Sequence, residues 1–334
     1  MPAQIMPASS DVAIRKAAAC LRAGQLVAFP TETVYGLGAD ATNGEAVARI
    51  FAAKGRPRFN PLIVHVATLE AARRIASFGD LSQRLAEAFW PGGLTLVVER
   101  REAAGLSDLV SAGLSSVAIR VPSHPIARRL IEAADLPIAA PSANVSGHVS
   151  ATTAAHVAAD FADPGRPAPA IILDGGAAPV GVESTIVDAR GPVPVLLRPG
   201  AISLEALEAV ADRQFQRDGH GRGEGGDEAT RPRSSPGQLE SHYAPAKAVI
   251  LDAQHPACGQ ALLAFGPAPA HNGPTFNLSP AGDLVEAASR LFEGLRTLDC
   301  TAAEAIAVMA IPEHGLGLAI NDRLRRAAAP RPAG

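Results

Sequence analysis

Three kinds of residue are scarce in this 334-residue chain: cysteine, the aromatic residues and lysine. The three cysteines, Cys20, Cys258 and Cys300, lie far apart, which excludes a disulfide framework and a C-x-x-C metal site. Thiols of this kind fit the reducing cytoplasm, where we expect the protein. Because only 4% of the residues are aromatic, the core has to consist mostly of Ala, Val, Leu and Ile. No window approaches the roughly 18 apolar residues of a membrane span, so we expect no membrane partner.

The charge balance is nearly even. There are 30 Lys plus Arg against 33 Asp plus Glu, a net charge of −3, and no polybasic block. This pattern gives no sign of an obligatory nucleic-acid or anionic-membrane surface. Only three of the basic residues are lysines: Lys16, Lys54 and Lys247.

Hydrophobic periodicity predicts strands and helices that alternate over about 200 residues. Since several strands follow one another near residues 171–197, the pattern favours a mixed sheet with flanking helices, in the α/β or α+β class. The predicted strands are residues 25–29, 62–66, 94–99, 117–121, 137–140, 171–173, 185–188 and 193–197. The predicted helices are residues 11–23, 45–53, 69–78, 81–89, 126–134 and 153–161.

The composition changes after a predicted helix at residues 201–212. Residues 214–238 are rich in Gly, Arg and Ser and nearly lack aliphatic side chains, which is typical of a linker. Further on, strands at 248–251 and 305–310 and helices at 283–298 and 318–328 predict a small Rossmann-like βαβ domain. We therefore predict a first domain at 1–207, a flexible linker at 208–245 and a second domain at 246–334.

The chain has neither a G-x-x-x-x-G-K-[ST] loop nor a G-x-G-x-x-G after a strand, which disfavours the usual nucleotide-binding folds. Polar clusters stand instead where apolar strands end, a position suited to binding residues. The first cluster, PTETVYGLG at 30–38, supplies two hydroxyls, a carboxylate and a phenol. An ordinary turn with a threonine helix cap would explain it equally well.

A second cluster, at 54–62, holds Lys54, Arg56, Arg58 and Asn60. A lysine is a point charge and an arginine a bidentate fork, so the two together suit a polyphosphate. Complementing a helix dipole is the plainer alternative. His65, in the aliphatic strand that follows, is either a ligand or a satisfied core histidine.

Three more clusters follow along the chain. Strand periodicity places Ser116 and Arg120 on one face, and Arg120 needs a carboxylate partner from the protein or from a substrate. Residues 141–153 carry hydroxyl and amide side chains before a predicted helix. These side chains could bind an anion, or they could simply cap the helix. The carboxylates at 174–188 have two possible roles. They could form the acid and base pair of a glycosidase, which the small number of aromatic residues disfavours, or they could lie near a loosely held Mg²⁺ that arrives with substrate phosphates.

In order along the chain, these clusters resemble the threonylcarbamoyl-adenylate synthase family, the YrdC-type proteins in their long form. The strings that carry the resemblance are PTETVYGLGA, KGRP..NPLIVHV, PGGLTLVV, VAIRVP, SANVSG, GVESTIVD and LLRPG. They cover residues 10–207, and SPG with HYAP at 235–245 resembles the family linker that closes over the active site. The resemblance implies a YrdC-like twisted mixed sheet with flanking helices.

The resemblance also implies a nucleotidyltransferase reaction. L-Threonine and bicarbonate form a carbamate, which attacks the α-phosphate of ATP to give threonylcarbamoyl-AMP and pyrophosphate. Mg²⁺ accompanies ATP, with no metal ligand assigned on the protein. A downstream threonylcarbamoyl transferase complex uses the product on tRNA next to the anticodon, and we expect no direct tRNA binding.

Carried over position by position, the family pattern implies two groups of binding residues. The L-threonine site comprises Thr33, His65, Arg120, Ser142 and Ser184, with the amino-acid carboxylate as the partner of Arg120. The ATP site comprises Lys54, Arg56, Asn60, Ser116, Asn144, Thr152, Arg198, His242 and Tyr243. The residues implied at the reacting centre are Lys54, Arg56, Ser142 and Asn144.

One segment departs from the family. Gln238-Leu239-Glu240-Ser241 stands where the family linker carries Met-Lys-Tyr-Arg, which removes two cations and adds a carboxylate. Two alternatives stay open: a non-catalytic double-stranded RNA or tRNA-binding module of the same fold, and a carbamoyl transferase of the hydrogenase-maturation type. The second would need acylphosphatase and zinc-finger segments that this sequence does not contain.

Overall fold

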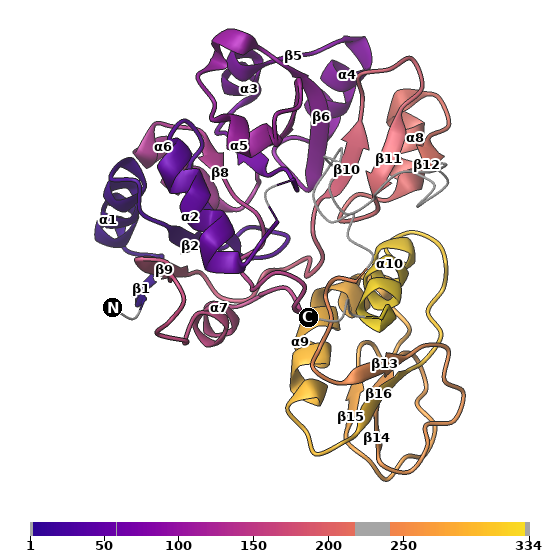
Figure 1. Ribbon diagram of the computed structural model, residues 1–334. Helices are drawn as coiled ribbons and strands as arrows, with labels where there is room; N and C mark the ends of the chain where they lie inside the picture. Colours follow the sequence, from indigo (N-terminus) through magenta and orange to yellow (C-terminus); the bar gives the residue numbers. More distant parts are fainter. Residues whose placement is uncertain (1–2, 58, 218–240, 331–334) are drawn as a thin grey trace.

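The computed structural model describes residues 3–57, 59–217 and 241–330. These residues form a large N-terminal part around a twelve-stranded sheet and a smaller C-terminal part around a four-stranded sheet (Figure 1). The α/β class predicted from the sequence is confirmed.

The N-terminal sheet is mixed, as predicted. Its order is β1-β9-β2-β3-β8-β4-β7-β6-β10-β11-β12, with β5 beside β6. Parallel pairs such as β4 with β7 alternate with antiparallel pairs such as β6 with β7. Its strands are β1 (Gln4–Pro7), β2 (Val27–Phe29), β3 (Gly36–Asp40), β4 (Ile63–His65), β5 (Ala76–Ser77), β6 (Leu94–Arg100), β7 (Ser116–Arg120), β8 (Ile138–Ala139), β9 (Ile171–Asp174), β10 (Thr185–Asp188), β11 (Val195–Arg198) and β12 (Gln216–Arg217).

The helices of this part begin at polar caps. Asn43, Thr68, Thr153 and Ser203 each accept hydrogen bonds from the first turn of the helix that follows, which satisfies backbone donors that would otherwise lack partners. The helices are α1 (Asp11–Arg22), α2 (Gly44–Lys54), α3 (Leu69–Ile75), α4 (Asp80–Phe89), α5 (Asp108–Ser111), α6 (Pro125–Ala134), α7 (Ala154–Asp160) and α8 (Leu204–Ala211), with a 3₁₀ turn at Glu102–Ala104.

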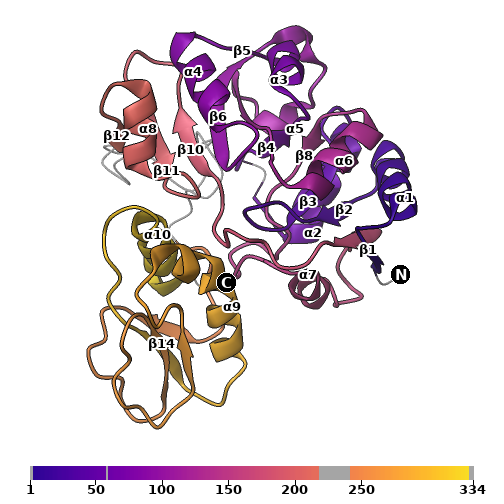
Figure 2. The ribbon, with the colours of Figure 1, turned by 180° about the vertical axis from the view of Figure 1, so that it is seen from behind.

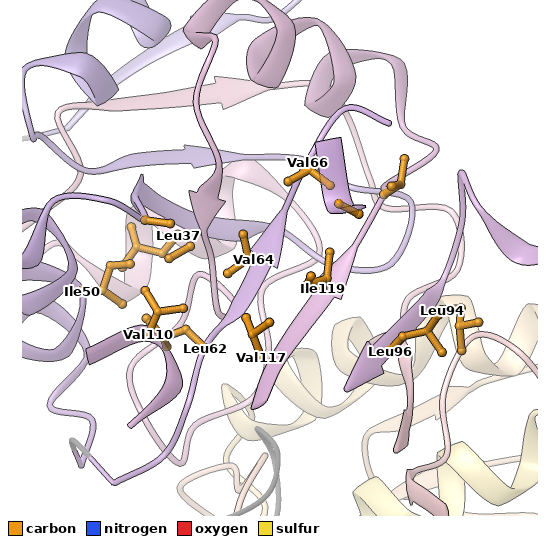
Figure 3. Close-up of a cluster of buried hydrophobic side chains, with 14 of the residues drawn as sticks. Leu37, Ile50, Leu62, Val64, Val66, Leu94, Leu96, Val110, Val117 and Ile119 are labelled. Carbon is orange, nitrogen blue, oxygen red and sulfur yellow. The ribbon is translucent and has the colours of Figure 1, made fainter. Parts of the chain in front are cut away.

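The largest core cluster is mostly aliphatic. Figure 3 shows Val64 of β4, Val117 and Ile119 of β7 and Leu94 and Leu96 of β6 within it, all at most 2% exposed. Removing this apolar surface from water holds the central strands in place. The rigid sheet then supports the polar side chains at the strand ends.

The C-terminal part is a four-stranded parallel sheet in the order β13-β16-β14-β15. Its elements are β13 (Ala248–Ile250), β14 (Gln260–Ala264), β15 (Thr275–Asn277), α9 (Leu284–Asp299), β16 (Ala305–Val308) and α10 (Gly317–Ala328). In both views α9 and α10 lie between this sheet and the N-terminal part (Figures 1 and 2). Helices of the small part therefore face the large one.

Several strands escaped the sequence prediction. The sequence predicts a turn at residues 36–38, whereas β3 is a buried strand paired with β2. Glycine is unusual inside a strand, but a Cβ at Gly38 would lie 2.8 Å from the Phe29 ring and 2.9 Å from Ile138. The close approach of these two side chains explains why glycine stands at position 38. Because the reason lies in distant residues, the local sequence does not predict the strand.

The predicted domain limits at 207 and 246 stay predictions. Residues 218–240 of the predicted linker lie outside the described residues. In the part of the chain that the structure describes, no helix is both long and apolar enough to cross a lipid bilayer.

We expect Gly38→Ala to lower the free energy of unfolding by about 1–3 kcal/mol, because the new methyl group overpacks β2, β3 and β8. Gly36→Ala is the matched control, since its Cβ would lie 3.3 Å from Phe29 and 3.4 Å from Ala140. Urea unfolding of both variants measures the difference. Equal losses at the two positions would contradict the packing explanation for β3.

Candidate active site

A pocket opens where several strands of the N-terminal sheet end. It encloses about 530 Å³ of space that no atom fills, part of it continuous with solvent. Its wall contains side chains that precede residues 218–240 in the sequence and side chains that follow them. The lining residues are Thr31, Thr33, Val34, Tyr35, Gly36, Arg56, Ile63, His65, Arg120, Ala140, Pro141, Ser142, Glu183, Ser184, Arg198, His242 and Tyr243.

All five residues implied for L-threonine line this pocket: Thr33, His65, Arg120, Ser142 and Ser184. The parallel pairing of β4 with β7 explains part of this convergence, because it places His65 directly beside Arg120. The segments that carry His65 and Arg120 lie far apart in the sequence, but the pairing of their strands brings the two side chains together. Four residues implied for ATP also line it: Arg56, Arg198, His242 and Tyr243.

Arg120 has an internal carboxylate partner. Its Nη2 donates to Glu32 at 2.6 Å, Nη1 to Thr33 Oγ1 at 2.8 Å and Nε to the Gly92 carbonyl at 3.1 Å. The protein therefore supplies one carboxylate for Arg120 itself, which is one of the two alternatives that the sequence left open. A guanidinium has five N–H groups, so about two remain for a ligand in the pocket.

The ion pair with Arg120 keeps the Glu32 carboxylate ionised. Burial acts to raise its pKa, but the charge and hydrogen bond of Arg120 outweigh burial and lower the pKa to about 2. Glu32 is therefore ionised at neutral pH and holds the Arg120 side chain in place.

His65 is neutral at physiological pH. Burial, with the nearby charge of Arg120, lowers its pKa to about 3. Its ring lies edge-on to Phe29, with centroids 6.3 Å apart. The uncharged imidazole is suited to hydrogen bonding rather than to binding an anion by charge.

Three cations beside the pocket are buried and lack carboxylate partners among the described residues. Lys54, Arg56 and Arg198 are 2%, 8% and 5% exposed, and they donate only to backbone carbonyls and one hydroxyl. Lys54 Nζ donates to the carbonyls of Ser142, at 2.6 Å, and Asn144. Burial, and then the charge of Arg56, hold the pKa of Lys54 well below its usual range. Unpaired buried cations are costly unless an anion joins them.

Ser184 is held from two sides. Arg198 donates to its carbonyl at 2.9 Å and to its hydroxyl at 3.1 Å, while Thr95 of β6 shares a hydrogen bond with that hydroxyl at 2.7 Å. Because Thr95 is completely buried, the anchor from β6 is independent of Arg198. Ser184 thus links the predicted L-threonine and ATP groups.

His242 and Tyr243 enter the wall from the last residues of the predicted linker. The His242 amide donates to the Arg326 carbonyl of α10, and the amide of Ala244 donates to Gly147 of the N-terminal part at 2.8 Å. Tyr243 stacks on Phe292 of α9, with centroids 5.7 Å apart. This end of the linker is therefore fixed to both parts of the protein, while Gln238, Leu239 and Glu240 of the departing segment lie outside the described residues.

The remaining residues implied for ATP are not among those that line the pocket. Ser116 begins β7, four residues before Arg120 and so about 13 Å away along the strand. Thr152 contacts His156 at 3.2 Å. Lys54 is connected to the wall because it donates to the carbonyl of Ser142, and it also donates to the carbonyl of Asn144. Asn60 is connected to the wall because its carbonyl accepts from Arg56.

Buried polar atoms without partners mark the same region. Six such side-chain atoms occur among the described residues, and five of them belong to residues implied in substrate binding. A native fold rarely leaves such atoms unsatisfied, so a ligand or water is expected there. The five are both amide atoms of Asn60, Nδ1 of His65, Oδ1 of Asn144 and Nδ1 of His242; the sixth is Nη2 of Arg323.

The residues implied by the resemblance do not include Tyr35 and Glu183, which line the pocket, or Glu32, which pairs with a residue that lines it. Tyr35 donates to the Gly176 carbonyl at 2.7 Å, Glu32 pairs with Arg120, and Glu183 accepts from Ser150 at 2.5 Å and from Arg323 at 2.9 Å. A buried carboxylate needs a cation, and only the folded chain shows which one.

The described residues contain no group of three or more His, Cys, Asp or Glu side chains that could hold a metal ion. The carboxylates nearest the pocket, Glu32 and Glu183, are already paired with arginines.

Comparison with known proteins gives consistent relatives. A family model described as "Telomere recombination" matches residues 19–200, and one described as "Threonylcarbamoyl-AMP synthase, C-terminal domain" matches residues 202–329. The threonylcarbamoyl-AMP synthase of Pyrococcus abyssi is 42% identical, covering 95% of this chain and 94% of its own length. That of Bacillus subtilis is 41% identical, covering 97% and 95%. The crystal structure of P. abyssi Sua5 complexed with L-threonine superimposes with a TM-score of 0.84 at 40% identity, covering 94% of each chain.

We expect Glu32→Gln to lower the free energy of unfolding at pH 6 and to lose that effect in acid. The lowered pKa of Glu32 contributes stability above its unfolded value of 4.5, and this contribution disappears as the pH falls through about 2. It is worth on the order of 3 kcal/mol. Urea unfolding of both proteins between pH 6 and pH 2.5 measures it, and a difference that stays constant with pH would contradict the ion pair.

Proposed function

The chain belongs to the threonylcarbamoyl-AMP synthase family, and from that premise we propose that it is an enzyme that makes threonylcarbamoyl-AMP and pyrophosphate from L-threonine, bicarbonate and ATP. The observation that carries the proposal is the set of buried cations beside the pocket, Lys54, Arg56 and Arg198, with no carboxylate partner among the described residues. A polyphosphate supplies the missing negative charge.

The L-threonine half of the site gathers around Arg120. Its two unused N–H groups suit the amino-acid carboxylate in a bidentate contact, because the fork of Arg matches a carboxylate. Thr33 and Glu32 fix the guanidinium at the pocket wall. The neutral ring of His65 and the hydroxyls of Ser142 and Ser184 complete the polar wall around the substrate.

The chemistry we propose is a nucleotidyl transfer. The amine of L-threonine and bicarbonate give a carbamate and water; a carbamate oxygen then forms a bond to the α-phosphorus of ATP as the bond to pyrophosphate breaks. Lys54 and Arg56 would stabilise negative charge on the phosphates, with Ser142 and Asn144 beside the reacting centre. This type of transfer depends on positioning and charge, so no protein nucleophile is required.

We propose that Mg²⁺ enters with ATP, held by its phosphate oxygens, where it would neutralise charge on the leaving pyrophosphate. This fits the donor set, because the carboxylates beside the pocket are engaged by arginines. The protein's own contribution would be the three buried cations Lys54, Arg56 and Arg198.

The product is a mixed anhydride between a carbamate and a phosphate, which water hydrolyses readily. We propose that a transferase complex consumes it to modify tRNA next to the anticodon. The near-neutral charge of the chain is consistent with small-molecule substrates and with no direct tRNA binding.

Pyrophosphate release that depends on L-threonine and bicarbonate tests the proposal. We expect Lys54→Ala to lower this rate at least about 100-fold, because a preorganised cation is lost from the phosphate site. Far-ultraviolet circular dichroism should show an intact fold.

Lys16→Ala is the matched control, since Lys16 is an exposed lysine of α1 that donates to Gln4 at 2.7 Å and does not line the pocket. It should leave the rate unchanged. Full activity of Lys54→Ala would overturn the phosphate assignment. Absence of turnover by the unsubstituted protein, together with salt-sensitive tRNA binding, would favour the RNA-binding alternative.

A further inference from the structure

Arg323, on α10 of the C-terminal part, reaches the wall of the pocket. It is completely buried, and its Nε donates to Glu183 Oε2 at 2.9 Å while its Nη1 donates to the Pro199 carbonyl at 2.6 Å. Glu183 lines the pocket, and Pro199 directly follows the pocket residue Arg198. One arginine therefore holds two segments of the N-terminal part.

These two segments cross closely behind the site. The Ala201 amide donates to the Glu183 carbonyl at 3.0 Å, and a Cβ at Gly200 would lie only 2.4 Å from that oxygen. Arg198 spans the crossing with its bonds to Ser184. The orientation of Arg198 therefore depends on how the segments at 183–185 and 198–200 are held together.

Arg323 also contacts the linker residue that enters the pocket. Its guanidinium lies 5.3 Å from the centre of the Tyr243 ring, within the range of a cation–π interaction. Tyr243 adopts a left-handed backbone conformation, with φ of 62°, that a non-glycine residue rarely takes without support. The contacts of the Tyr243 ring with Arg323 and with Phe292 supply that support.

Stability alone does not explain this arginine. A buried ion pair adds little compared with apolar residues of similar size, and Nη2 of Arg323 has no partner among the described residues. In the part of the chain that the structure describes, all the other unpartnered buried side-chain atoms belong to residues implied in substrate binding. The same signature associates Arg323 with the site, in addition to its place at the interface between the two parts.

We propose that Arg323 is a positioning residue that sets Arg198 and Tyr243 for ATP; the inference rests on the proposed function. The L-threonine half has anchors of its own. Thr95 fixes the Ser184 hydroxyl, and Glu32 fixes Arg120. Loss of Arg323 should therefore affect ATP far more than L-threonine.

Calorimetric titration of the full chain with ATP and with L-threonine tests this. Arg323→Met should raise the Kd for ATP at least about tenfold and change that for L-threonine less than about threefold. Arg323→Lys keeps the charge but not the fork, so the Kd for ATP should rise about three- to tenfold.

Arg296 provides the matched control. It also joins the two parts, with an ion pair to Asp160 at 2.8 Å and a hydrogen bond to the Val149 carbonyl, but Asp160 does not line the pocket. Arg296→Met should change either Kd less than about threefold. If Arg323→Met does not fold, Arg323→Lys is compared with Arg296→Lys in the same assay.

Equal weakening of ATP binding by the Arg323 and Arg296 variants would overturn the inference, as would equal weakening of ATP and L-threonine binding by Arg323→Met. These titrations require no turnover. If the unsubstituted protein binds both ligands without releasing pyrophosphate, the proposed function fails while the role of Arg323 is still decided by the affinities. An unsubstituted protein that does not bind ATP would overturn both.

Discussion

Three buried cations with no carboxylate partner among the described residues constrain the architecture around them. Their charge has to be solvated from within, and backbone carbonyls do this for Lys54, Arg56 and Arg198. Carbonyls inside a strand are used by the sheet, so the free ones lie where the hydrogen-bond ladder stops. They belong to residues 60–61 before β4, 142 and 144 after β8, and 184 before β10. The pocket therefore occupies the irregular ends of strands on a rigid sheet.

The carboxylates near the pocket are arranged so that they do not cancel this charge. Glu32 is paired with Arg120, and Glu183 is paired with Arg323. The second pair joins the C-terminal part to the N-terminal part, so docking of the small sheet neutralises a carboxylate that lines the pocket beside the cations. The interface between the two parts and the electrostatics of the site are one feature of the fold.

Much of this could be predicted from local sequence, and the rest depends on contacts between distant residues. The helices at Gly44–Lys54 and Ala154–Asp160 follow from polar caps and apolar periodicity. β3 could not be predicted, because its glycines are explained by Phe29 and Ile138, which only the fold brings near. The need of Arg120 for a carboxylate was readable, but its partner stands 88 residues away at Glu32. Arg323 gave no signal at all, since it lies in an ordinary amphipathic helix.

The rarity of lysine has a physical reading at position 54. An ammonium group has three N–H donors, and the carbonyls of Ser142 and Asn144 take two of them, which leaves one for a ligand. A planar guanidinium with five donors would leave more of them unsatisfied at a site that is only 2% exposed. Burial and the charge of Arg56 hold the pKa of this lysine well below its usual range, whereas a bound polyanion would favour its charged form. A phosphate ligand and the proton on Lys54 therefore stabilise each other, and this coupling ties the affinity of the site to the protonation of one side chain.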